Sequence, residues 1–205
     1  MYDALLEHMP RVVENSILEK LGLEPKVYAV LTLHRVENVN NPSRLAEIVQ
    51  AVTQLNEITI IFPVHPRTKT QLDSKGLLPK IKTARHIRVL DPVGYYEMLK
   101  LVSNARFVLT DSGGLQKEAF WLKTPCITLR KNTEWVETVR MGANILVGTS
   151  RQNIIRKTKF IMKNENISNK IIKMKNPYGD GKAAKKIVKI ITSHSTNTSV
   201  PSYVK

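Results

Sequence analysis

Residues 107–118 have the residue types and spacing of an anion-binding turn. An apolar run at residues 107–109 leads through Asp111, Ser112 and two glycines into a segment of helical character. The first N–H groups of a helix have no partner within it and carry partial positive charge. Glycines let a phosphate approach the backbone closely, and Ser112 can cap the helix or donate its hydroxyl. The stretch therefore predicts a phosphate site at the start of a helix.

Glu118 lies four residues after Gly114, so the carboxylate shares a helix face with the turn. A carboxylate does not hold a phosphate, but it accepts hydrogen bonds from a pair of sugar hydroxyls. With phosphates at Gly113 and Gly114 and a ribose at Glu118, the stretch predicts a nucleotide-sugar site. The alternative that involves no ligand is an ordinary strand-to-helix turn capped by Ser112.

A serine hydrolase is a third interpretation, because Asp-Ser-Gly-Gly also surrounds the nucleophile of chymotrypsin-like proteases. That fold consists of two β-barrels, with a His and an Asp earlier in the chain. Here the tetrapeptide lies between a predicted strand and a predicted helix, and the Gly-x-Ser-x-Gly motif is absent from the sequence. Both observations argue against hydrolysis.

Predicted strands and helices alternate along the chain. Apolar, β-rich runs predict strands in residues 26–33, 59–65, 87–92, 107–110, 126–129 and 145–147. Helices are predicted in residues 3–21 with a break at Pro10, from Pro42, after Pro66, in residues 95–102 and 115–122, and two or three times after Ser150, with residues 34–41 as a polar loop. This alternation predicts an α/β fold with a doubly wound, Rossmann-like parallel sheet.

Polar residues collect directly after five of the predicted strands. They are His34 and Arg35, His65 and Arg67, Asp91 and Pro92, Asp111 and Ser112, and finally Arg130, Thr133 and Glu134. A single His or Arg at a strand end usually caps, packs or is solvated. Ligands of parallel sheets bind at the carboxyl ends of the strands, so five such groups predict one shared site. Two His–Arg pairs at this edge also suit a diphosphate.

Composition limits the class of protein. The 205 residues suffice for one large domain or two small ones, and the hydrophobic content of 42% is typical of a globular protein. No signal peptide or long apolar run is present, which predicts a cytoplasmic protein without a membrane segment. The lone Cys126 is expected to be a buried thiol, and no Cys/His cluster has metal-ligand spacing, so no metal is predicted.

The net charge of +15 is concentrated near the end of the chain. Residues 1–150 hold 19 Lys and Arg against 15 Asp and Glu, whereas residues 151–205 hold 13 against 2. A nucleic-acid-binding module would show such a basic segment. The sequence lacks a zinc finger, an RNA-recognition signature and interleaved aromatic residues, so solvated lysines on amphipathic helices are the preferred interpretation.

Six motifs occur in order and carry a resemblance to a known family. They span residues 32–38, 62–67, 111–119, 129–137, 142–148 and 176–181. Together they resemble the carboxyl-terminal half of the non-hydrolysing UDP-N-acetylglucosamine 2-epimerases, over roughly residues 3–191. The resemblance implies one half of a two-domain, glycosyltransferase-B-type architecture with UDP in the cleft. It also implies elimination of UDP to a 2-acetamidoglucal and re-addition on the other face, without a cofactor, in cell-surface polysaccharide synthesis.

The resemblance assigns roles to individual residues. His34 and Glu134 would act at the reacting sugar, and His65 and Arg67 would border a second, regulatory UDP-sugar site. The substrate-binding set would comprise Arg35, Pro92, Tyr95, Met98, Ser112, Gly113, Gly114, Glu118, Arg130 and Thr133, with Glu118 at the ribose and Pro92, Tyr95 and Met98 around the uracil. Many relatives have Arg-Pro where this sequence has Trp135-Val136. The Trp form of the motif resembles that of relatives that act on UDP-2,3-diacetamido-glucuronate.

The resemblance also implies a domain organisation and a missing partner. Residues 1–22 would form a lead-in or interdomain helix, residues 23–192 the UDP-binding domain, and residues 193–205 a frayed tail. Family chains are about twice this length, two domains of ordinary size, and carry the acid–base carboxylates in their amino-terminal domain. The chain is therefore expected to be a split or truncated product that needs an amino-terminal half, a homo-oligomer or both. The UDP-binding half of a glycosyltransferase is the alternative within the same architecture.

Overall fold

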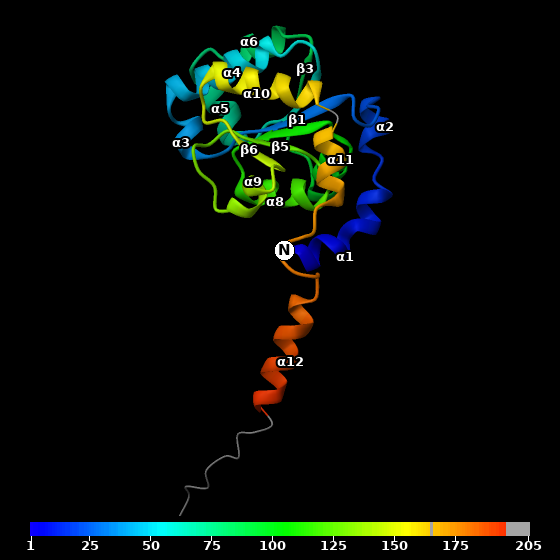
Figure 1. Cartoon of the computed structure of the whole chain (residues 1–205). Helices are drawn as coiled ribbons and strands as arrows, with labels where there is room; N and C mark the ends of the chain where they lie inside the picture. Colours follow the sequence, from blue (N-terminus) through cyan, green and yellow to red (C-terminus); the bar gives the residue numbers. More distant parts are fainter. Residues whose placement is uncertain (165, 196–205) are drawn as a thin grey trace, which may run out of the picture.

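The computed structural model describes residues 1–164 and 166–195 of the chain. Six parallel strands form one sheet in the order β3-β2-β1-β4-β5-β6 (Figure 1). The strands are β1 (Tyr28–Thr32), β2 (Thr59–Pro63), β3 (Ile87–Leu90), β4 (Phe107–Thr110), β5 (Cys126–Thr128) and β6 (Asn144–Leu146). This confirms the predicted α/β fold with a doubly wound parallel sheet.

Helices cover both faces of the sheet. The helices are α1 (Tyr2–Val13), α2 (Ile17–Leu21), α3 (Val36–Val39), α4 (Pro42–Gln54), α5 (Pro66–Ser74), α6 (Leu78–Thr83), α7 (Tyr95–Asn104), α8 (Gly113–Trp121), α9 (Val136–Arg140), α10 (Arg151–Lys163), α11 (Asn166–Lys173) and α12 (Ala183–Ser195). Buried side chains of α4, α5, α6 and α10 pack on one face, and those of α2, α7 and α8 pack on the other. The inner strands β1, β2, β4 and β5 are thus apolar on both sides, as their continuous hydrophobic runs predict.

The central strand β1 shows how the two cores arise from alternation along one strand. Ala29 and Leu31 join the cluster under α4 and α10, whereas Tyr28 and Val30 join the cluster under α7 and α8. The backbone pairs with β2 on one side and β4 on the other, with Thr32 opposite Thr110 at the carboxyl end. The ends of β1 and β4 therefore lie side by side, where the sheet order reverses and ligands bind.

Three local predictions were wrong. The expected break at Pro10 does not occur, because α1 continues through this exposed residue between the buried side chains Leu5 and Val12. The expected polar loop at residues 34–41 contains α3, whose Asn38 and Val39 are buried. The helix expected from residue 115 begins at Gly113, so both glycines belong to its first turn.

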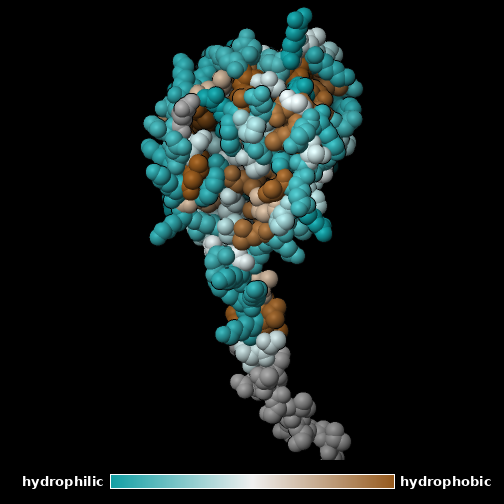
Figure 2. Space-filling model, turned by 90° about the vertical axis from the view of Figure 1, so that its right-hand side faces the viewer, coloured by the Kyte–Doolittle hydropathy of each residue, from teal (hydrophilic) through white to brown (hydrophobic). Residues whose placement is uncertain are grey.

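The last helix, α12, leaves the body of the molecule and points away from it (Figure 1). Its start is fastened to α1, since the Ala184 N–H donates to Asp3 Oδ2 at 2.9 Å. The side chains of Ile187 and Val188 are 56% and 59% exposed, and apolar surface is visible along the helix in Figure 2. Residues 196–205, most of the predicted tail, lie outside the described residues.

Among the residues that the structure describes, no helix combines the length and the apolar character needed to cross a membrane.

Candidate functional site

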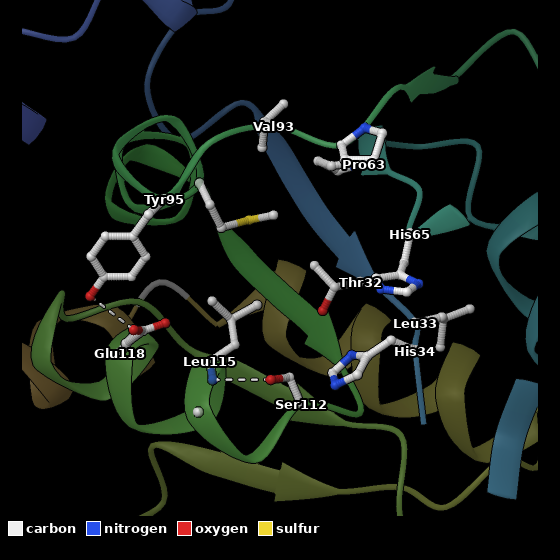
Figure 3. Close-up of a pocket in the computed structure, with 13 residues that line it drawn as sticks. Thr32, Leu33, His34, Pro63, His65, Val93, Tyr95, Ser112, Leu115 and Glu118 are labelled. Carbon is white, nitrogen blue, oxygen red and sulfur yellow. Dashed lines mark hydrogen bonds between the residues drawn. The ribbon is translucent and has the colours of Figure 1, made fainter. Parts of the chain in front are cut away.

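The turn between β4 and α8 has the geometry of an anion site. The Ser112 N–H donates to Thr110 Oγ1 at 2.9 Å, and Ser112 Oγ accepts from the Leu115 N–H at 3.4 Å (Figure 3). Ser112 is therefore the N-cap of α8, and its hydroxyl proton remains available to a ligand. As the first two residues of α8, Gly113 and Gly114 present N–H groups that have no partner within the helix.

A cavity of about 400 Å³ opens in front of this turn. It lies at the carboxyl ends of β1, β2 and β4 and against α7, as the sheet topology requires (Figure 3). Its predicted members are His34, His65, Pro92, Tyr95, Met98, Ser112, Gly114 and Glu118. It is also lined by Thr32, Leu33, Pro63, Val93 and Leu115, whose ordinary apolar or strand-end character gives no functional signal in the sequence.

Glu118 and Tyr95 form the far wall of the cavity. Tyr95 Oη donates to Glu118 Oε1 at 3.1 Å, a contact visible in Figure 3. Burial raises the pKa of the Glu118 carboxyl, and the hydrogen bond from Tyr95 opposes that rise. Burial and the neighbouring Glu118 raise the pKa of Tyr95 to about 12, so the phenol remains a donor at neutral pH. A half-buried carboxylate thus faces the cavity and accepts a hydrogen bond from Tyr95.

Asp111 fixes the loop that carries His34. This fully buried carboxylate accepts hydrogen bonds from the N–H groups of His34 and Arg35 and from Asn38 Nδ2, each at 3.1 Å. The Asn38 amide also donates to the Leu129 carbonyl at 3.0 Å. Three strand ends, those of β1, β4 and β5, are joined in this way. The sequence places Asp111 after a strand, but its partners are far apart in the chain and only folding reveals them.

The two predicted histidines are neighbours in the cavity lining, with ring centroids 6.4 Å apart (Figure 3). His34 Nδ1 lies 3.4 Å from Asp111 Oδ1, so the imidazole is placed beside a buried carboxylate. His65 Nδ1 accepts from the Arg67 N–H at 3.2 Å and so caps α5. The Arg67 side chain is exposed and does not line the cavity.

Arg130, Glu134, Arg35 and Thr133 gather beside Gly113 rather than in the cavity wall. Arg130, only 9% exposed, binds Glu134 with both terminal nitrogens at 3.0 Å. These hydrogen bonds lower the pKa of Glu134 and hold it as an ionised acceptor. A Cβ on Gly113 would meet Arg35 Nη2 at 3.3 Å and Glu134 Oε2 at 3.4 Å. Glycine therefore allows this charged cluster to approach the start of α8.

Fold and site together define a Rossmann-like domain with anion-site geometry at a helix N-terminus. Comparison with known proteins agrees with this class and makes it specific. The family model described as UDP-N-acetylglucosamine 2-epimerase matches residues 1–192. The chain belongs to this family, which confirms the resemblance drawn from its motifs.

Individual relatives match over part of their length. A UDP-N-acetylglucosamine 2-epimerase of Methanocaldococcus jannaschii is 48% identical over 168 residues, which are 80% of this chain and 44% of that relative. A UDP-2,3-diacetamido-2,3-dideoxy-D-glucuronate 2-epimerase of Pseudomonas aeruginosa is 45% identical over 62% of this chain and 35% of its own length.

A solved structure gives the same result. The crystal structure of a Methanocaldococcus jannaschii UDP-GlcNAc 2-epimerase in complex with UDP-GlcNAc and UDP matches with a TM-score of 0.83 and 41% identity. The match covers 94% of this chain and 52% of that one. The chain thus spans about half the length of the relatives it matches, in agreement with the carboxyl-terminal half that its motifs predict.

Proposed function

We propose that this chain is the UDP-sugar-binding half of an enzyme that interconverts UDP-N-acetylglucosamine and UDP-N-acetylmannosamine. In the forward reaction a base removes the C2 proton and the C1–O bond to UDP breaks, which gives 2-acetamidoglucal and free UDP. UDP then adds back to C1 while a proton is delivered to the opposite face of C2. The reaction is redox-neutral, and every group that leaves is returned.

The observation that carries this proposal is that the start of α8 and Glu118 open onto the same cavity. In the proposed complex the N–H groups of Gly113 and Gly114 and the Ser112 hydroxyl bind the diphosphate. Glu118 accepts both ribose hydroxyls, which compete with the Tyr95 phenol for the carboxylate. The uracil lies against Pro92, Tyr95 and Met98, which line the same cavity.

The charged cluster beside Gly113 binds and positions the sugar of the substrate. His34, oriented by Asp111, offers Nε2 to the departing diphosphate, and Arg35, Arg130 and Thr133 position the pyranose. Because its pKa is lowered, Glu134 is a weak proton acceptor and acts as an oriented hydrogen-bond acceptor for sugar hydroxyls. The base that removes the C2 proton therefore belongs to the complementary half. His65, with Arg67, is assigned to a second UDP-sugar site at the cavity entrance.

Calorimetry with UDP tests the nucleotide site. Glu118→Ala removes the acceptor of the ribose hydroxyls, and we expect UDP binding to weaken by about 1–3 kcal/mol. Glu19→Ala, an exposed glutamate of α2, is the matched control and should bind UDP as the unchanged chain does. Equal affinities of the unchanged chain and Glu118→Ala would contradict the ribose assignment.

A second substrate, UDP-2,3-diacetamido-glucuronate, is favoured by the Pseudomonas aeruginosa relative and by Trp135-Val136. Trp135 lies at the end of the connection between β5 and α9, residues 129–135, which we call the sugar loop. The C5 carboxylate of this substrate would need a cation, and Arg35 and Lys131 lie on or beside this loop. Turnover of the two UDP-sugars by the chain with its complementary half decides between them. Transfer of the sugar to an acceptor, with inversion or retention at C1, would instead indicate a glycosyltransferase.

A further inference from the structure

Trp135 connects the sugar loop to the first peptide groups of α8. Its indole Nε1 donates to the Gly113 carbonyl at 2.7 Å, across 22 positions of the chain. The Gly113 carbonyl and the Gly114 N–H belong to one planar peptide group. A hydrogen bond that fixes the carbonyl therefore fixes the direction of the N–H on its other side, and also polarises it as a donor.

The preceding peptide group is held in the same manner. Gln116, fully buried, donates from Nε2 to the Ser112 carbonyl at 3.2 Å. That carbonyl shares its peptide plane with the Gly113 N–H. Gln116 Oε1 in turn accepts from Thr133 Oγ1 at 2.5 Å, and Thr133 Oγ1 accepts from the Trp135 N–H at 3.1 Å. The Gly113 and Gly114 N–H groups at the proposed anion site are thus both oriented by one hydrogen-bond network that starts in the sugar loop.

The indole ring of Trp135 packs against α8 through a contact with Lys117. Lys117 Nζ lies 4.0 Å from the Trp135 ring centroid, 4.6 Å from that of Tyr178 and 5.1 Å from that of Trp121. The Tyr178 ring meets the Trp135 ring edge-on at 5.8 Å. A cation held among three rings keeps the indole in one orientation, so Nε1 stays directed at Gly113.

We propose that Trp135 is a positioning residue that aims the Gly114 N–H at the diphosphate of the bound nucleotide. The inference rests on the proposed function, because it takes UDP as the ligand. It adds that the sugar loop controls diphosphate affinity through a hydrogen bond to the helix, without touching the phosphate. The proposed uracil and ribose contacts, Tyr95 and Glu118, hydrogen-bond to one another, whereas the Trp135 indole donates to Gly113.

Binding of UDP and of uridine to Trp135→Phe tests this role. Phenylalanine keeps an aromatic ring beside Lys117, and it removes the N–H donor together with the second ring of the indole. We expect UDP affinity to fall about fivefold to tenfold, the effect of one hydrogen bond, and uridine affinity to stay within about twofold. An unchanged UDP affinity would overturn the inference. So would an equal loss for UDP and uridine, because it would mean that Trp135 only supports the fold.

Trp121→Phe is the matched control. Trp121 is the only other tryptophan of the chain and contacts the same lysine, but its Nε1 donates to Asn176 Oδ1 at 3.2 Å. Phenylalanine keeps an aromatic ring at position 121 beside Lys117, so we expect unchanged UDP affinity. In this variant Trp135 is the sole tryptophan, so its fluorescence should shift with UDP and not with uridine, which tests the inference even if Trp135→Phe does not fold. Failure of the unchanged chain to bind UDP would refute the proposed function instead.

Discussion

At the scale of single residues, the charge of Glu118 reduces the stability of the folded state at neutral pH. Glu118 is half-buried at the cavity wall, where desolvation raises its pKa and the hydrogen bond from Tyr95 opposes that rise. A carboxyl whose pKa is raised by folding stabilises the folded state below its ordinary pKa of 4.5 and loses that contribution as the pH rises. At neutral pH the ionised carboxylate therefore disfavours folding, which is common for residues retained for a ligand.

Glu118→Gln should consequently be more stable than the unchanged chain at pH 7. The amide keeps an acceptor for Tyr95 Oη and cannot ionise. The gain should shrink as the pH falls towards 4.5, because both side chains are then neutral. Urea unfolding at several pH values measures the difference, with Glu19→Gln as an exposed control. A gain that does not depend on pH, or a loss at pH 7, would contradict this assignment of the charge.

Residue type and position after a strand predicted much of the site, including His34, Ser112 and Glu118. They did not reveal the contacts that organise it. Trp135 attracted attention only as a departure from relatives, because a hydrogen bond between residues 22 positions apart leaves no periodic signal. Whether each predicted residue binds substrate remains a prediction that the variants above address.

At the scale of elements, one carboxylate holds the site's loops together. Asp111, at the end of β4, accepts from two backbone N–H groups of the β1–α3 connection and from Asn38. Apolar runs predicted all six strands, most clearly the inner strands, whose residues are buried on both faces of the sheet. The short helix α3 escaped prediction because its four residues, Val36–Val39, are too few for helical periodicity and depend on tertiary contacts such as this one.

Asp111→Asn should destabilise the fold by about 3 kcal/mol, because the new amide directs donors at groups that are themselves donors and loses the charge. Urea unfolding of the chain measures the change. Asp73→Asn, an exposed position on α5, is the control and should change stability by less than about 0.5 kcal/mol. A cost for Asp111→Asn as small as that of the control would show that the loop does not depend on this carboxylate.

At the scale of the whole molecule, the proposed function makes the described residues one wall of a cleft. The chain covers 52% of the UDP-bound relative, and its cavity opens at the edge of the sheet. Helix α12 adds an amphipathic surface that points away from the body, with Ile187 and Val188 more than half exposed. An apolar face of this kind fits a second domain, and we expect the complementary half to cover it.

The chain alone should therefore not exchange the C2 proton of UDP-N-acetylglucosamine. The base must lie within hydrogen-bond reach of C2, and Glu134, the carboxylate nearest Gly113, is held by Arg130 with a lowered pKa. In heavy water, NMR should show no deuterium at C2 with the chain by itself, and incorporation once an amino-terminal half of a family member is added. Replacing Ile187 and Val188 by Ser should raise the amount of added half required and leave UDP binding unchanged. Exchange by the purified chain alone would show that the base lies on this chain. It would refute the proposal that this chain binds the UDP-sugar while the complementary half supplies the base.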